Sequence, residues 1–480
     1  MKQIFAIAVV LLGSCVSNVL YAETQEFHIS IGYATPSVSN IGSSFGHSFL
    51  LVHSGTPSLQ DTAYSYVVED IPASTLTKLK AGFDGSLELG LKQYQLHEQI
   101  RYYANIESRD IYLYQLRLTP DQVNQILQLL HNSDFVSYHF TSQNCATQLE
   151  NTLISAGVLQ AENHHFDTPL RLINRIKKSD LVEETFYIQN AVDLFLDDYR
   201  ALTTYEQDQF HEYLDVENKF KTNRDVSTAV LSYLDLPEKI NSFTSDELKA
   251  LLNGIQIQDP APKTQVLPGD AIDPSRNKPI QAIYIGAGTV NKHGKDAFAR
   301  IEYRLGASER DAFTYQRLGQ AVVPFELSLL KGEEITQVEY SLFDIRNFNE
   351  FEPFFKRPSW SVAAHGNYTN TPDEKWNDFV INAKVGLTLF PNHHNRLFAG
   401  ANFDCGWQQG AACQIGSYLD FASRLNSALF FNAGLIAGHK RTESEISLSA
   451  DLSAKYVLEF YFQNTQIGEQ LGLKLRTYID

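Results

Sequence analysis

The sequence has little positive charge, few cysteines and no long apolar run after its first residues. It carries 39 lysines and arginines against 56 aspartates and glutamates, which gives a formal net charge of −17. No basic cluster offsets this acidic balance, which argues against nucleic-acid binding. No later stretch reaches the roughly 18 uninterrupted apolar residues that a membrane helix needs. A membrane span in this chain would therefore have to be built from strands.

What the sequence does contain fits a folded, exported chain. The 480 residues suffice for about two or three domains, and a hydrophobic content of 43% excludes a disordered chain. Residues 1–22 are typical of a secretory signal peptide, because Lys2 precedes an apolar run and the small Ala22 comes just before Glu23. The stretch "LLGSC" also resembles a lipobox that would lipidate Cys15, and an uncleaved anchor is a third interpretation. All three place the protein outside the cytoplasm, where disulfides form.

The four cysteines of the chain separate into different classes. Cys405 and Cys413 lie at either end of a Gly- and Gln-rich turn between two strand-like runs, which predicts a disulfide across a hairpin. The alternative, two free thiols in a loop, is disfavoured by an oxidising compartment. Once Cys15 is removed or lipidated, Cys145 has no partner. An odd cysteine in an exported protein is either buried and inert or kept free because it reacts.

The chain divides into three regions by its patterns. Residues 23–160 mix strand-like runs such as "FGHSFLLVHSG" with two helices, one capped by Thr119 and one starting at Cys145, and they predict an α+β domain. Residues 161–277 show helical patterns, among them "TSDELKALLNGI" with a Thr244 or Ser245 cap, and then a proline-rich linker. Residues 278–480 form the third region, in which the pattern changes.

The third region alternates between apolar and polar residues with a period of two. Ile301 and Tyr303 fall on one face of a run, and Arg300, Glu302 and Arg304 fall on the other. About twelve such runs, each about ten residues long, predict an antiparallel membrane β-barrel with lipid outside and polar groups inside. A soluble sandwich or a lipocalin-like barrel would show the same alternation with the faces exchanged. Aromatic residues near the run ends could form interfacial girdles: Tyr303, Trp360, Tyr368, Phe403, Tyr456 and Phe462.

Cys145 occupies a position that suits nucleophilic chemistry. Asn144 is a good N-cap, so Cys145 is the first residue of the predicted helix. The unpaired N–H groups and the dipole of a helix start lower the pKa of a thiol, and the same N–H groups can form an oxyanion hole. Such a nucleophile also needs a base, which is usually a histidine.

Four histidines are candidates for that base. His131 ends a helix and is expected at the surface, and His139 is expected in a strand. His47 follows Gly46 in a strand that would fix its ring, and His53 lies six residues later on the same face of that strand. A zinc site is a weaker alternative, since the chain has no HxxxH or CxxC spacing. We therefore expect neither a metal nor a cofactor.

Three stretches together resemble a known family. "SSFGHSFLLVHSG", "YANIESRDIYLYQLRLTPDQV" and "YHFTSQNCATQLENTL", in that order, resemble the Lnb N-terminal periplasmic domain family over residues 28–160. The resemblance implies a permuted papain-like, NlpC-type thiol fold, in which the histidine strand precedes the cysteine helix. It implies Cys145 as nucleophile and His47 as base. Arg109 and Asp110 also fit the family pattern, although such a pair can simply tie a strand to its neighbour.

The resemblance also implies an activity. One member of the family resembles a lipoprotein N-acyltransferase that works through an acyl-enzyme thioester and has membrane helices after its thiol domain. This chain has a barrel-like region there instead. We expect a thiol-dependent acyltransferase or hydrolase that acts on acyl lipids or lipoproteins at the periplasmic face of the outer membrane. His53 is a candidate third catalytic residue, orienting His47 or polarising a carbonyl.

Two alternatives to this activity remain. One is a peptidoglycan amidase or endopeptidase, and the other is a non-catalytic outer-membrane barrel with a periplasmic plug or binding domain. The expected partners are accordingly an acyl lipid, lipoprotein or peptidoglycan substrate and the outer membrane, with no nucleic acid.

Overall fold

The computed structural model describes the chain from residue 27 to residue 479 with gaps. The described residues are 27–37, 43, 45–69, 75–139, 142–162, 167–214, 223–255, 265–266, 273–274, 278–291, 295–307, 320–348, 354–355, 357–372, 375–392, 395–406, 412–426, 428–438, 442–453, 455–465 and 468–479. The predicted signal segment and most of the predicted linker lie outside them. Contacts divide the chain into two compact units, one of residues 1–34 and 47–267 and one of residues 35–46 and 268–480.

An antiparallel sheet forms the centre of the first unit. Its strand order is β6-β4-β3-β2-β1-β5-β7-β8, so β1 lies between β2 and β5. β7 extends the sheet beyond the residues 23–160 expected for the thiol domain. The strands are β1 (His28–Ala34), β2 (His47–His53), β3 (Thr62–Val68), β4 (Leu87–Gln95), β5 (Ile111–Leu116), β6 (Val136–Tyr138), β7 (Val182–Ile188) and β8 (Gln265–Val266).

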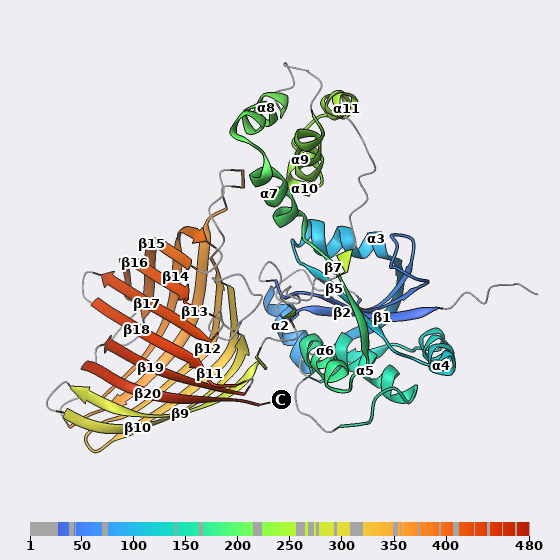
Figure 1. Ribbon diagram of the computed structural model, residues 1–480. Helices are drawn as coiled ribbons and strands as arrows, with labels where there is room; N and C mark the ends of the chain where they lie inside the picture. The colour runs from blue at the N-terminus through green and yellow to red at the C-terminus, as the bar shows by residue number, and fades with distance from the viewer. Residues whose placement is uncertain are drawn as a thin grey trace, which may run out of the picture. The chain divides into compact units, whose positions relative to one another are not determined.

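Helices cover both faces of this sheet. α3 lies on one face, and α4, α5 and α6 lie on the other (Figure 1). The bounds are α2 (Thr75–Asp84), α3 (Leu96–Gln99), the π-helix η2 (Ile100–Ile106), α4 (Pro120–His131), α5 (Cys145–Ser155) and α6 (Pro169–Lys178). Thr119 caps α4 as predicted, because its hydroxyl accepts the N–H of Gln122 at 3.3 Å. α5 begins at Cys145 as predicted. The expected α+β domain is thus confirmed.

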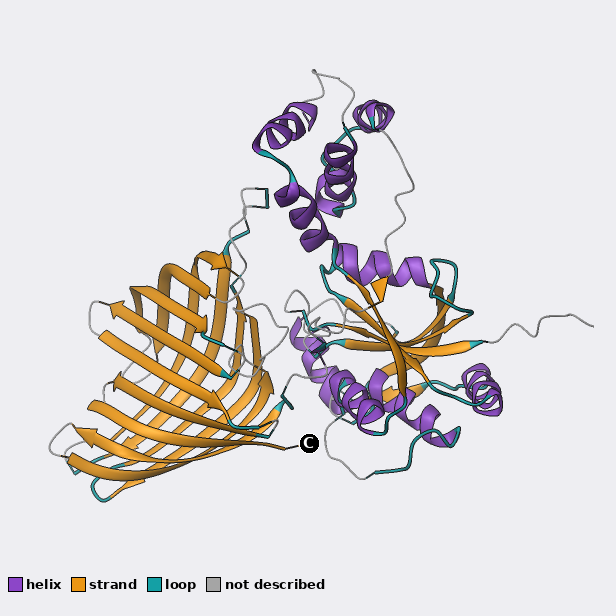
Figure 2. Cartoon of the chain, viewed as in Figure 1, coloured by secondary structure: helices purple, strands orange, loops and turns teal. Residues whose placement is uncertain are grey.

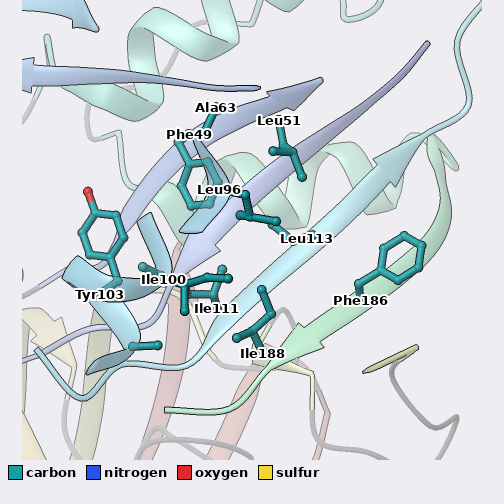
Figure 3. Packing of buried hydrophobic residues seen from close by; sticks show 12 residues of the cluster. Phe49, Leu51, Ala63, Leu96, Ile100, Tyr103, Ile111, Leu113, Phe186 and Ile188 are labelled. Atoms are coloured by element: carbon teal, nitrogen blue, oxygen red, sulfur yellow. The ribbon is translucent and has the colours of Figure 1, made fainter. Parts of the chain in front are cut away.

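The main core of this unit lies between the sheet and the α3–η2 segment. Figure 3 shows side chains from β2, β5 and β7 meeting those of α3 and η2. Each buried aliphatic or aromatic side chain contributes about 1.5–3 kcal/mol, so this cluster holds β2 and η2 against each other. The clustered residues are Ala34, Phe49, Leu51, Ala63, Leu96, Ile100, Tyr103, Ala104, Ile111, Leu113, Phe186 and Ile188.

In the described part of the chain, five short helices lie between β7 and β8 in sequence. They are α7 (Ala191–Ala201), α8 (Thr204–Leu214), α9 (Arg224–Leu234), α10 (Pro237–Ile240) and α11 (Ser245–Gly254). Phe195 packs against Phe210 and Tyr233, with ring centroids 5.9 and 5.2 Å away. Thr244 caps α11, one of the two caps expected from the sequence. Among the described residues, no helix is long and apolar enough to cross a bilayer.

The second unit contains a closed antiparallel barrel, seen as the ring of strands in Figure 2. Each strand pairs with its sequence neighbours, and β9 pairs with β20 to close the ring. The predicted barrel of about twelve strands is confirmed. Its strands are β9 (Gln281–Asn291), β10 (Lys295–Ala307), β11 (Gln320–Gly332), β12 (Thr336–Asn347), β13 (Ser359–Asn370), β14 (Lys375–Asn392), β15 (Asn395–Gly406), β16 (Ala412–Arg424), β17 (Leu429–Gly438), β18 (Thr442–Asp451), β19 (Tyr456–Thr465) and β20 (Gly468–Ile479).

The two faces of the barrel differ as a membrane barrel requires. Arg300, Glu302 and Arg304 are buried, whereas Ile301 between them is 52% exposed. Further exposed apolar side chains occur along the strands: Ile285, Leu327, Leu329, Ile381, Val385, Leu387, Leu389, Leu419, Leu435, Ile446, Leu448, Phe460, Leu471, Leu473 and Leu475. Lipid contacts the outside of such a barrel, and polar groups pair within it. The alternative of a soluble sandwich with exchanged faces is wrong.

Ion pairs join opposite charges inside the barrel. Arg476 pairs with Glu459 at 2.9 Å, and Lys474 pairs with Glu302 at 3.2 Å. These four side chains are nearly inaccessible to solvent. A paired charge avoids much of the desolvation penalty that an isolated buried charge would meet.

The predicted disulfide is also confirmed. Cys405 and Cys413 are register partners on β15 and β16, and they are bonded. Within the described residues, Cys145 is the cysteine that remains free.

Candidate functional site

Asn144 fixes the start of the α5 helix and therefore the position of Cys145. Its side-chain oxygen accepts the N–H groups of Ala146 at 2.9 Å and Thr147 at 3.2 Å. Its side-chain nitrogen donates to the backbone carbonyl of Asp167 at 2.8 Å. Because all these groups are largely buried, the first turn of α5 has little freedom to move.

A cluster of ion pairs anchors α5 to α6. The hydroxyl of Thr147 donates to Asp167 at 3.0 Å, and Arg171 pairs with Asp167 and with Glu150 at 3.2 Å each. Arg175 also pairs with Glu150, which is 2% exposed. Removing one partner of a buried pair is strongly destabilising, so this cluster holds the helix that carries Cys145.

The thiol of Cys145 lies in a partly buried and polar environment. Burial raises its pKa above the ordinary value of 9.0, and contacts with Ser48, with the N–H of Ala146 and with the charge of Arg109 oppose that rise. The expectation that the helix start lowers the pKa is therefore wrong in its net sign, because desolvation of the thiolate is the larger effect. At neutral pH the resting group is the thiol.

Ser48 contacts this thiol through two groups. Both its backbone N–H and its hydroxyl favour the thiolate of Cys145. The side chain is 0% exposed, and its hydroxyl has no partner at ordinary hydrogen-bonding distance in the described part of the chain. A buried polar group without a close partner is rare and calls for an explanation.

His47 is the first residue of β2 and is held on two sides. Its Nε2 lies 2.8 Å from the hydroxyl of Ser65, and its ring stacks on Tyr103 with centroids 5.3 Å apart. Burial, assisted by the positive charge of Arg109, lowers the pKa of His47 from 6.5 to about 3. The imidazole is therefore neutral at physiological pH, and Nδ1 is the ring nitrogen not engaged by Ser65.

Arg109 places a fixed positive charge beside the ring of Tyr103. Its guanidinium is 4.8 Å from the Tyr103 ring centroid. It donates to the carbonyl of Ala34 at 2.8 Å and pairs with Glu107 at 2.6 Å. With an exposure of 2%, it is screened little by solvent. Its charge disfavours the imidazolium form of His47 and favours the thiolate form of Cys145.

The structure brings Cys145 and His47 into one neighbourhood through shared contacts. Ser48, which contacts the thiol, directly follows His47 in β2. Tyr103 stacks on His47 and interacts electrostatically with Cys145. Among the described residues, no hydrogen bond joins the imidazole to the thiol directly. The two groups therefore share Tyr103 and Arg109 as surroundings, and they are not in direct contact.

His53 belongs to a different environment. Six residues of extended strand separate it from His47, a span of about 20 Å. Its ring nitrogens lie 2.8 Å from the hydroxyl of Ser30 and 2.7 Å from the carbonyl of Gly55. Burial lowers the pKa of His53. The residues that contact the His47 ring are Ser65 and Tyr103, and the structure does not bring His53 to the thiol.

The contacts of the other residues considered in the sequence analysis are structural. His131 is exposed at the end of α4, and His139 pairs through its backbone with Gln143. Asp110 accepts both the backbone and the side-chain N–H of Asn190, at 2.9 and 2.7 Å. Asp110 thus connects β5 to the start of α7, which is the structural role that the sequence left open for the Arg109–Asp110 pair. Within the described residues, no group of three His, Cys, Asp or Glu side chains could hold a metal ion.

Three site residues escaped the reasoning from sequence: Ser48, Ser65 and Tyr103. Tyr138, like Tyr103, interacts electrostatically with Cys145, and burial raises the pKa of both phenols. The one available signal was proximity in sequence, since Ser48 adjoins His47. Ser65 and Tyr103 reach the site through strand pairing and a π-helix, which no local pattern specifies.

Comparison with known proteins gives one family match. The family model of the Lnb N-terminal periplasmic domain matches residues 19–179. These residues include β1 to β6, both Cys145 and His47, and the α6 helix that anchors the cysteine helix. No curated protein matches the chain.

Solved structures give likenesses of low identity. They include the KdgM porin, with 6% identity and a TM-score of 0.26 over 42% of this chain and 99% of that one. The COG4313 outer membrane channel from Pseudomonas putida F1 has 10% identity and a TM-score of 0.28 over 45% of this chain and 100% of that one. The outer membrane phospholipase A from Escherichia coli has 8% identity and a TM-score of 0.26 over 47% of this chain and 95% of that one. At these scores no activity follows from the likenesses. Residues 19–179 of the chain thus match the Lnb N-terminal periplasmic domain family, and a closed antiparallel β-barrel with an apolar outer surface follows them.

Proposed function

We propose that this protein is a cysteine-nucleophile acyltransferase or hydrolase that acts on acyl lipids or lipoproteins at the periplasmic face of the outer membrane. The observation that carries the proposal is the environment of Cys145. A free thiol at a fixed helix start lies near backbone and hydroxyl donors and a buried positive charge, and it shares that charge and Tyr103 with the neutral His47. An inert core cysteine needs none of these neighbours.

The proposed reaction begins with a neutral Cys145 thiol and a neutral His47 imidazole. Nδ1 of His47 takes the proton of the Cys145 thiol, and the sulfur attacks the carbonyl carbon of an ester. The N–H groups of Ser48 and Ala146 stabilise negative charge near the sulfur and the carbonyl oxygen. The tetrahedral intermediate collapses, and the alcohol leaves with the proton from His47. The acyl group then remains on Cys145 as a thioester.

The second half of the reaction returns the enzyme to its starting state. His47 takes a proton from an incoming amine or water, which attacks the thioester carbonyl. The Cys145 sulfur leaves and receives that proton back as a thiol. Ser65 is a positioning residue in this scheme, because its hydroxyl holds Nε2 and leaves Nδ1 for proton transfer. His53 receives no role in the reaction.

The choice of acyl lipids or lipoproteins as substrate rests on two supports. The matched family is described as periplasmic, and the barrel has the apolar outer surface of a membrane anchor. A domain anchored in this way meets phospholipids and lipoproteins at the membrane surface. Peptidoglycan, the substrate of the amidase alternative, lies farther from that surface.

The test uses the full-length protein in vesicles that contain phospholipid and a diacylated lipopeptide. We expect a Cys145 adduct with the mass of one acyl chain, detected by intact mass and removed by neutral hydroxylamine. Cys145→Ala should abolish both the adduct and acyl release, whereas replacing Cys405 and Cys413 by serine should leave both. Acyl release that persists in Cys145→Ala, or no adduct with any acyl donor, would overturn the proposal.

A second candidate function is supported by the barrel interior. The lumen holds a cavity of about 460 Å³ lined by charged residues of both signs, among them Glu326, Lys384 and Arg476. A cavity with this polar lining is typical of a pore. In this candidate function the N-terminal domain would be a plug or a binding module. Single-channel currents in planar bilayers test this candidate. Steady conductance by the Cys145→Ala variant, together with no acyl chemistry by the wild type, would favour it.

A further inference from the structure

We propose that Ser48 is a catalytic residue whose hydroxyl donates a hydrogen bond to the Cys145 sulfur and holds the thiolate that forms during the reaction. This inference rests on the proposed role of Cys145 as nucleophile and identifies a side chain that serves it. Ser48 was not among the residues that sequence motifs pointed to.

The first support is the burial of a hydroxyl that the resting fold does not use. The Ser48 side chain is 0% exposed, and within the described chain its hydroxyl has no partner at ordinary hydrogen-bonding distance. A fully buried hydroxyl without a close partner is unfavourable for folding, and alanine would fit the same space. A serine at this position therefore has a use other than stability.

The second support is what this hydroxyl faces. The α5 helix, which starts at Cys145, packs directly against β2, which carries Ser48, and the hydroxyl and backbone N–H of Ser48 both favour the thiolate of Cys145. A neutral thiol is a weak acceptor and needs no such donors, whereas a thiolate is a strong acceptor. The hydroxyl thus gains its partner only when the proton has left the sulfur.

The third support is that the other donors at the thiol are already engaged or lie farther away. The N–H of Ala146, which also favours the thiolate, donates at 2.9 Å to the Asn144 side chain. Arg109 acts through its charge while bonded to Glu107 and Ala34. Ser48 supplies a hydroxyl that can rotate toward the sulfur as the charge appears.

The proposed step balances without any further reactant. Nδ1 of His47 accepts the thiol proton, and the electron pair of the broken S–H bond stays on sulfur. The Ser48 hydroxyl rotates to donate to that sulfur. When the thioester later breaks, the sulfur is again anionic, and the same hydroxyl stabilises it as the leaving group until His47 returns the proton.

The experiment measures the pH dependence of Cys145 alkylation by iodoacetamide in the full-length protein, read by intact mass. Wild type is compared with Ser48→Ala and with Ser227→Ala, a matched control in which another buried serine, in α9, is changed. We expect Ser48→Ala to move the midpoint of the profile upward by about one pH unit, which slows labelling about tenfold at neutral pH. The rate at the alkaline plateau should equal that of wild type, and Ser227→Ala should follow the wild-type profile.

Thermal melting of the same variants separates catalysis from folding. We expect the melting temperature of Ser48→Ala to equal or exceed that of wild type, because the lost hydroxyl has no close partner in the resting state. A Ser48→Ala profile that coincides with wild type overturns the inference. So does a lower melting temperature combined with slower labelling at every pH, since that result means a structural hydroxyl. Failure of the acyl adduct to form in wild type is a separate result, and it removes the proposed function itself.

Discussion

Replacing Asn144 by alanine removes the cap that places Cys145. The side chain is 7% exposed and satisfies two N–H groups of α5, at 2.9 and 3.2 Å, and the carbonyl of Asp167 at 2.8 Å. Loss of an N-cap costs about 1 kcal/mol. Loss of the donor to the buried Asp167 carbonyl adds about 1–3 kcal/mol. The structure therefore predicts a local cost of about 2–4 kcal/mol at the start of α5.

Hydrogen–deuterium exchange of the full-length protein, read by mass spectrometry of peptides, measures this cost. A loss of about 2 kcal/mol corresponds to about a 30-fold faster exchange in the first turn of α5. The α4 helix keeps its Thr119 cap, so its exchange should not change and it serves as an internal control. Exchange of Ala146 and Thr147 in the Asn144→Ala variant at the wild-type rate would refute the capping argument.

Asn144→Asp separates capping from charge at the same position. Aspartate keeps the acceptor for Ala146 and Thr147 but loses the donor to the Asp167 carbonyl, so α5 should keep only the capping part of its protection and exchange more slowly than in Asn144→Ala. The added negative charge near the sulfur disfavours the thiolate, so alkylation of Cys145 should shift to higher pH. A variant that lost helix protection but kept the wild-type labelling profile would contradict both statements.

Three further predictions concern other parts of the chain. The pKa of His47 falls from 6.5 to about 3 on folding. Below pH 6.5 the imidazole of His47 therefore binds a proton in the unfolded state but stays neutral in the folded state. Stability should therefore decline as pH falls below 6.5, by about 2 kcal/mol near pH 5, and thermal melting of His47→Gln should lack this decline. Replacing both Cys405 and Cys413 by serine should leave the barrel closed but lower the temperature at which it unfolds, measured by the mobility of heated samples on gels. The cysteines are 8 residues apart, so their disulfide contributes only about 2–3 kcal/mol of stability. Arg396→Met breaks a buried pair with Asp420 at 2.5 Å and should cost about 3–5 kcal/mol in urea unfolding of the detergent-solubilised barrel, whereas adding Asp420→Leu should recover part of that loss.

Local patterns predicted the barrel and the disulfide because both depend on short-range regularities. The inward Arg300 and the outward Ile301 alternate as the period of a strand demands, and neighbouring strands pair in chain order. Cys405 and Cys413 are register partners because the turn between them joins adjacent strands. In such a meander, sequence neighbours are also spatial neighbours, so the sequence pattern is sufficient.

The site in the first unit depends on pairings that no local pattern encodes. Ser65 reaches His47 because β3 pairs with β2 in a register that matches Leu51 with Ala63. Tyr103 reaches the imidazole from a π-helix, which no sequence pattern predicts. The helix start at Cys145 was predictable, whereas its burial, which sets the sign of the pKa shift, depends on the whole fold.

The pairing of β9 with β20 has a consequence for biosynthesis. β9 begins at Gln281, but its second partner consists of the 12 residues Gly468–Ile479, which the ribosome makes only after β10 to β19. Until then both margins of the sheet expose unpaired N–H and C=O groups, which a bilayer does not tolerate. A stop codon just before residue 468 would therefore abolish the membrane anchor as completely as the loss of the entire second unit, although it leaves the sequence of β9 to β19 intact.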